Sequence, residues 1–149
     1  MRLTPLAAAA ALLVSCHPAS SGPDLDVRQA WARETAPGQT GGAVYLTIVN
    51  RGGSDDRLVG VATPRAAMAM LHGSSISGGI MAMRMVAAMD VSAGATVSLA
   101  PLGSHVMLEG VAQPLRMGET IPLTLSFAKS GKRMVEAKVL AAGSAGPAQ

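Results

Sequence analysis

Apolar and polar residues alternate over short stretches between residues 27 and 140, and clusters of Gly, Pro, Ser and Asp separate these stretches. Alternation with a period of two is typical of strands that bury one face. No stretch shows a convincing period of an amphipathic helix. Nine strands are predicted, at residues 27–33, 42–50, 57–63, 67–72, 80–86, 96–99, 105–109, 121–128 and 133–140. Short strands at this spacing predict an all-β, single-domain β-sandwich with Greek-key connections.

The first 15 residues differ from the rest of the chain. Arg2 precedes an apolar run at residues 6–14, which has the length of a signal-peptide core and is too short to span a bilayer. The run ends in Leu13-Val14-Ser15-Cys16, which resembles the bacterial lipobox, where the cysteine becomes the first mature residue and carries lipid. Residues 1–15 are therefore predicted to be a lipoprotein signal peptide. The alternative is an ordinary signal peptide cleaved nearby, with Cys16 incidental.

Two further segments lack an apolar period. Residues 16–26 are rich in Pro, Ser and Gly, so we expect a flexible tether between an anchor and the domain. Residues 141–149 contain mainly Ala, Gly, Ser and Pro and are predicted to be a disordered tail. The domain itself is assigned to residues 27–140.

Composition excludes several classes of protein. The net charge is only +3, the longest basic cluster in the domain is Lys132-Arg133, and one Phe, one Trp and one Tyr are available to stack on bases, so nucleic acid is a poor partner. Cys16 is the only cysteine, so no intramolecular disulfide can form. The sequence contains no Ser/His/Asp set, paired carboxylates or phosphate loop, and we predict that the protein is not an enzyme.

Histidine and methionine concentrate between residues 72 and 107, which hold two of the three histidines. Thioether sulfur is a soft, neutral ligand that favours Cu(I), and imidazole binds copper in either oxidation state. The concentration therefore indicates a soft-metal site. Residues two apart on a strand share a face, which groups His105 with Met107, Met68 and Met70 with His72, and Met81 with Met83 and Met85. Residues 73–79 have the length of a hairpin link, but the register that would bring these faces together stays open.

Four of these residues follow the pattern H-x10-M-x21-H-x-M, formed by His72, Met83, His105 and Met107. The pattern resembles the ligand set of the periplasmic copper chaperone family, often called PCu(A)C. The surrounding text is similar as well, at residues 31–33, 42–50, 57–62, 105–108 and 122–127. The resemblance extends over residues 27–140 and implies a cupredoxin-like β-sandwich.

The resemblance implies that His72, Met83, His105 and Met107 are the copper ligands. Met81 is a candidate additional contact, because relatives commonly carry Met at this place. A neutral set of two imidazoles and two thioethers favours Cu(I) over a divalent ion. The remaining methionines are predicted to fill the core, namely Met68, Met70, Met85, Met89, Met117 and Met134. The loop at residues 73–79 is uncharged, whereas relatives often carry acids there, so affinity or partner docking is expected to differ.

The function implied by the resemblance is that of a periplasmic, membrane-anchored metallochaperone. It would deliver Cu(I) to a partner, in this family a cytochrome oxidase subunit or its assembly factor. A copper-buffering or resistance protein without a dedicated recipient is the alternative. An electron-transfer cupredoxin is disfavoured because blue-copper sites need a Cys thiolate, and Cys16 lies outside the domain.

Overall fold

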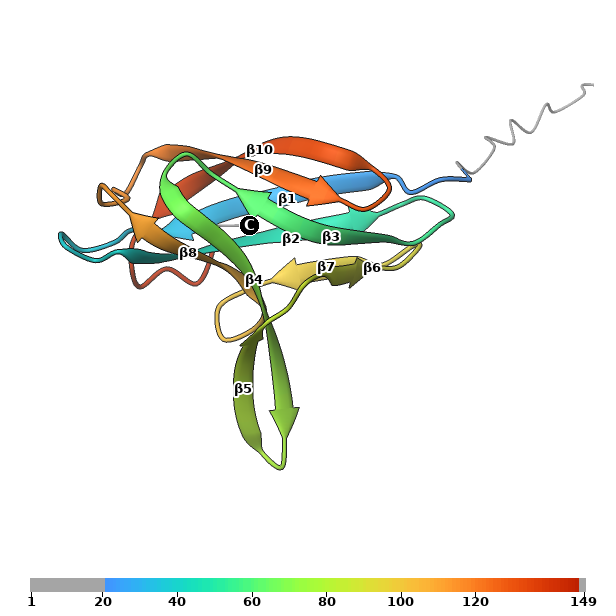
Figure 1. The fold of residues 1–149 in the computed structure, drawn as a ribbon, viewed down its shortest axis with the longest axis horizontal. Helices are drawn as coiled ribbons and strands as arrows, with labels where there is room; N and C mark the ends of the chain where they lie inside the picture. The colour runs from blue at the N-terminus through green and yellow to red at the C-terminus, as the bar shows by residue number, and fades with distance from the viewer. Residues whose placement is uncertain (1–20, 148–149) are drawn as a thin grey trace, which may run out of the picture.

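The computed structural model describes residues 21–147, which form ten strands joined by turns and no helix (Figure 1). The predicted signal peptide and Cys16 lie outside the described residues. In residues 21–147 there is consequently no helix of a length and hydropathy that would span a membrane. The strands are β1 (Leu25–Arg33), β2 (Gly41–Asn50), β3 (Asp56–Ala62), β4 (Ala66–Ser77), β5 (Ile80–Met85), β6 (Met89–Val91), β7 (Thr96–Leu99), β8 (His105–Val111), β9 (Thr120–Phe127) and β10 (Gly131–Leu140).

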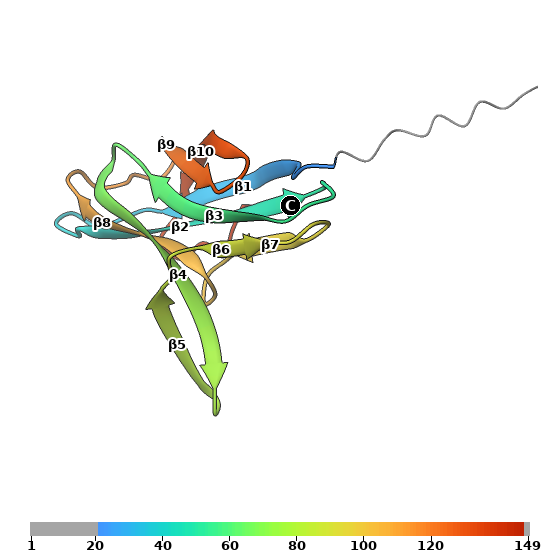
Figure 2. The same cartoon turned by 45° about the vertical axis from the view of Figure 1, so that its right-hand side comes forward.

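All ten strands belong to one continuous sheet. Nine of them follow the order β5-β4-β8-β2-β1-β10-β9-β3-β6. The tenth, β7, pairs with residues 46–49 of β2, beyond the part of β2 that pairs with β8. Every pairing is antiparallel except that of β1 with β10. The sheet is rolled, because β6 at one end of this order contacts β2 near its middle (Figures 1 and 2). Rolling brings the two halves of the sheet face to face and encloses the core between them, so the predicted all-β sandwich is confirmed.

The core is built from the alternating apolar positions of the central strands. On β9, every second residue from Ile121 to Phe127 is buried, and on β8, Val106 and Leu108 are fully buried. The intervening residues of β8, His105 and Met107, therefore face outward. Core packing thus decides which face of β8 carries the predicted ligands.

One carboxylate lies in the protein interior. Asp56, at the start of β3, is 2% exposed and accepts hydrogen bonds from the backbone N–H groups of Arg57, Lys129 and Ser130 and from the Ser130 hydroxyl. Burial alone would raise the pKa of Asp56, but the bonds from Ser130, Lys129 and Arg57 outweigh burial and lower the pKa below its ordinary value of 3.8. The ionised side chain ties the β9–β10 turn to β3.

The hairpin formed by β4 and β5 is longer than the sequence pattern predicts. The predicted strand at residues 67–72 continues to Ser77, because residues 72–77 pair with residues 80–85. The turn is reduced to Gly78 and Gly79, whose positive φ angles of 59° and 78° are strained for other residues. The Ser and Gly residues of this stretch have the composition of a loop, although residues 72–77 are paired with β5 throughout. The short strand β6 was not predicted at all.

Both predicted flexible segments are partly ordered. The tether was predicted to extend to residue 26, yet β1 begins at the buried Leu25, and the Asp24 N–H donates to the Asn50 side chain. In the predicted disordered tail, residues 141–147 fold back along β1. The Arg33 guanidinium donates to the Ser144 carbonyl at 3.0 Å, and Gly146 lies against the Trp31 ring. These contacts help to cover Trp31, which is only 5% exposed, and they explain why a segment of small residues is held in place.

Candidate metal centre

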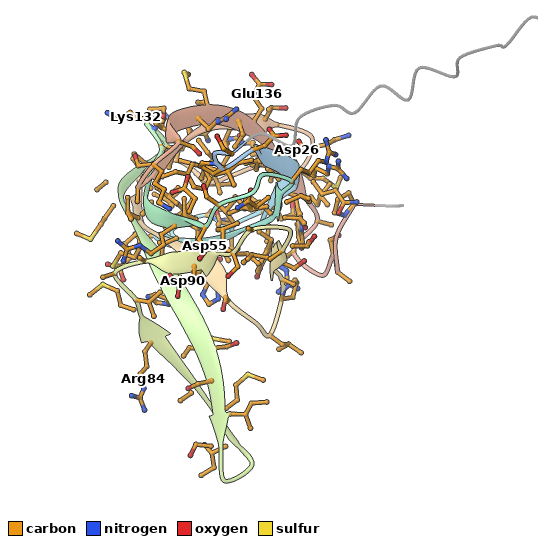
Figure 3. All side chains as sticks on the ribbon, turned by 90° about the vertical axis from the view of Figure 1, so that its right-hand side faces the viewer. Asp26, Asp55, Arg84, Asp90, Lys132 and Glu136 are labelled. Atoms are coloured by element: carbon orange, nitrogen blue, oxygen red, sulfur yellow. The ribbon has the colours of Figure 1, made fainter. Side chains whose placement is uncertain are left out.

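The outer part of the β4–β5 hairpin projects from the rolled sheet as a separate arm (Figures 1 and 2). Its tip carries exposed apolar side chains, among them Ile76 and Ile80. Arg84 is the one residue of the hairpin with a permanent charge, and it points away from the arm (Figure 3). Arg84 lies between Met83 and Met85 in the sequence, so its side chain is on the opposite face from theirs. The face that carries the methionines of β5 is therefore free of charge.

The two predicted histidine ligands are direct cross-strand neighbours. His72 on β4 pairs with His105 on β8, and the centroids of their rings are 5.2 Å apart. Both residues are half-buried. This distance places both imidazoles within reach of a single ion between them.

His105 is held in one orientation by the loop that precedes it. Its Nδ1 lies 3.1 Å from the carbonyl oxygen of Gly103. A carbonyl can only accept a hydrogen bond, so Nδ1 carries the proton and Nε2 keeps its lone pair. A hydrogen bond of this kind commonly orients a metal-ligating histidine. The loop itself is closed by the Ala100 N–H, which donates to the Ser104 carbonyl, and the Ser104 hydroxyl accepts from the Ser74 N–H of β4.

The predicted methionine ligands lie on the same face of the sheet as the two histidines. Met107 is two residues beyond His105 on β8, and Met83 pairs with Ser74, which is two residues beyond His72. The Met107 methyl lies over β2, where a Cβ added to Gly41 would be 3.2 Å from it. Met107 also lines an open pocket of about 360 Å³ beside Tyr45. Met107 is thus half-buried at the edge of an opening to solvent.

Buried aromatic rings close one side of the site. The Tyr45 ring is 6.3 Å from the His105 ring, and Trp31 packs on Tyr45 with 4.5 Å between centroids. The Arg33 guanidinium lies over the Tyr45 ring, 5.7 Å from the ring centroid. The site therefore has the rings of Tyr45 and Trp31 on its β2 side and the exposed methionines of β5 on its hairpin side.

The structure brings the four predicted ligands to one face, and Met81 lies further out on the same face, opposite Ile76. Whether they bind metal stays a prediction. Within residues 21–147, no three His, Cys, Asp or Glu side chains are grouped as a metal site would require. The donors of this face are imidazoles and thioethers, which suit a soft, monovalent ion.

Four methionines predicted to fill the core are exposed instead. Only Met89 of that set is buried, and Met70 is half-buried. The prediction was wrong for Met68, Met85, Met117 and Met134. Two of the set lie beside the predicted ligands, because Met85 pairs with His72 and Met70 pairs with Met107. In the sequence, Met85 is two residues from Met83 and Met70 is two residues from His72. This spacing was the sequence feature that placed both methionines on the face of the predicted ligands.

Comparison with known proteins places this arrangement in a family. A family model described as "Putative lipoprotein LpqE-like" matches residues 25–139. A curated relative named "Putative lipoprotein Lxx21020", from Leifsonia xyli subsp. xyli (strain CTCB07), is 32% identical over 111 residues, which cover 74% of this chain and 66% of the relative. The chain thus spans slightly less than two thirds of that relative.

Solved structures of similar fold include two copper complexes. The copper-bound PCuAC domain from PmoF2 is 26% identical with a TM-score of 0.68, over 78% of this chain and 92% of that domain. CuI-DR1885 from Deinococcus radiodurans is 31% identical with a TM-score of 0.63, over 85% of this chain and 81% of that protein. These similarities confirm the cupredoxin-like fold and the resemblance to PCu(A)C. The chain therefore belongs to the LpqE-like lipoprotein family, and its domain has the fold of PCuAC copper-chaperone domains.

Proposed function

We propose that this protein is a Cu(I) metallochaperone that holds one ion through His72, Met83, His105 and Met107. The observation that carries the proposal is the pair of imidazoles 5.2 Å apart on a face whose other donors are thioethers. Neutral nitrogen and sulfur ligands stabilise a monovalent copper ion without a charged partner. Copper complexes of two structural relatives support the same cargo.

The position of the site suits delivery rather than permanent storage. The histidines are half-buried and Met83 is 45% exposed. Thiolates of a partner can approach from the side of the exposed Met83 and displace the neutral ligands one at a time. We propose a copper-receiving protein as that partner, a cytochrome oxidase subunit or its assembly factor.

The Cu(I)-loaded chain should transfer its ion to an apo copper-accepting domain with a cysteine pair, at a rate that rises with acceptor concentration. Contact between the two proteins explains this dependence, because each acceptor thiolate must meet the bound ion. Stopped-flow absorbance of the acceptor's copper centre measures the rate. A buffering protein would instead release copper at a rate independent of the acceptor, and that result would contradict a dedicated delivery function.

We also propose that the mature chain is anchored to a membrane in the periplasm through lipid on Cys16. The lipobox-like sequence and the lipoprotein names of the family and of its curated relative support this proposal. One acyl chain gives only marginal membrane binding, whereas the several chains of a bacterial lipoprotein give stable anchoring.

Expression of the wild-type gene should therefore give a mature protein whose mass exceeds that of residues 16–149 by a diacylglycerol and an acyl group. Cys16→Ser should abolish the added mass and shift the protein from the membrane fraction to the soluble fraction. Mass spectrometry of both proteins is the measurement. An unmodified, soluble wild-type product would rule the anchor out.

A further inference from the structure

The register of the hairpin singles out a methionine beyond the four predicted ligands. Met85 pairs directly with His72, whereas Met83 pairs with Ser74 and is therefore diagonal to His72. Directly opposite residues of an antiparallel pair have Cβ atoms about 5 Å apart, and diagonal neighbours are about 7–8 Å apart. His72 thus has His105 as its neighbour on one side and Met85 on the other.

Met85 has no evident role in the core that would account for its position. Its side chain is 69% exposed, compared with 45% for Met83. The residue that follows, Val86, packs against the core and donates its backbone N–H to the Leu71 carbonyl. This anchor fixes the base of the hairpin, where Met85 lies, while Met83 and Met81 lie successively further out along β5.

We propose that Met85 is a further copper ligand, which exchanges with Met83 at the site formed by His72, His105 and Met107. The inference rests on the proposed function, since it concerns the same ion. Five donors then serve an ion that takes four. One Cu–S bond breaks as another forms, the copper stays monovalent, and no proton moves.

Leucine substitutions test the proposal, because leucine keeps the volume of methionine and removes the sulfur. The variants are Met83→Leu, Met85→Leu and the double variant, measured in the mature chain by competition with a chromophoric Cu(I) chelator. Each single substitution should lower Cu(I) affinity by less than about tenfold, since the other thioether replaces the lost one, whereas the double substitution should lower it by more than about 100-fold. Met134→Leu, at an 80% exposed position on β10, is the matched control and should leave affinity unchanged.

X-ray absorption of the copper-loaded variants gives a second readout. The wild-type chain and Met83→Leu should both show two sulfur ligands, and the double variant should show one. If Met83→Leu alone loses a sulfur and binds as weakly as the double variant, Met85 is not a ligand and the inference is wrong, while the proposed function stands. If the wild-type chain itself fails to bind Cu(I), both the proposed function and this inference are overturned.

Discussion

Replacing both His72 and His105 with leucine should lower the Cu(I) affinity of the mature chain by more than about 100-fold. Loss of a residue that merely orients a metal ligand costs about 10–100-fold in affinity, so loss of two ligands should exceed that range. The variant keeps the thioethers of Met83 and Met107, which hold Cu(I) weakly by themselves. Competition with a chromophoric Cu(I) chelator measures the change.

The third histidine of the chain gives the matched control. His17 lies outside the described residues, and its replacement by leucine should leave the affinity unchanged. Thermal unfolding of the metal-free double variant should stay close to that of the wild type, because both rings face outward and neither belongs to the core. Wild-type affinity in the double variant would show that the imidazoles 5.2 Å apart are not copper ligands.

Asp56→Ala should lower the free energy of unfolding by about 2–4 kcal/mol, because it leaves buried hydrogen-bond donors without an acceptor. The wild-type carboxylate accepts from three backbone N–H groups and one hydroxyl. Urea denaturation at neutral pH measures the loss. Asp55→Ala is the matched control, since Asp55 is exposed and accepts a single bond, from the Ala93 N–H.

The difference in unfolding free energy between the wild type and Asp56→Ala should depend on pH. The pKa of Asp56 is lower in the folded chain than its ordinary value of 3.8. The stability that ionised Asp56 supplies is therefore complete above pH 3.8 and is lost as the pH falls through the lower folded value. The difference in unfolding free energy between wild type and Asp56→Ala should shrink over that acidic interval. A difference that stays constant down to full protonation would contradict the role of the charge.

Strands that bury one face were predictable from the sequence, because alternation records burial directly. On β9, the buried Ile121, Leu123 and Leu125 alternate with polar or exposed positions, and the predicted strand matches the observed one closely. The strand β6 has only three residues, too few to show a period. The outer half of β4 was missed because Ser74, Ser75 and Gly73 have the composition of a loop while the partner strand supplies their hydrogen bonds.

The predicted site residues were brought to one face, but the sequence could not rank the methionines around them. Methionine is apolar and usually fills cores, so a hydrophobicity pattern cannot predict that the methionines of β5 are exposed. Which thioether stands beside His72 depends on the hairpin register, and that register follows from the Gly78-Gly79 turn. A shift by two residues would have placed Met83 opposite His72 instead.

The projecting β4–β5 arm is a surface whose side chains can change with little effect on the folding of the domain. Its exposed side chains contribute little to the core, so substitutions there lower the free energy of unfolding far less than substitutions of the fully buried Leu108 or Leu125. Ile76 and Ile80 at its tip can therefore be replaced while the packing of the rolled sheet stays the same. The arm thus gives this fold a surface whose shape and polarity can change without loss of a stable domain.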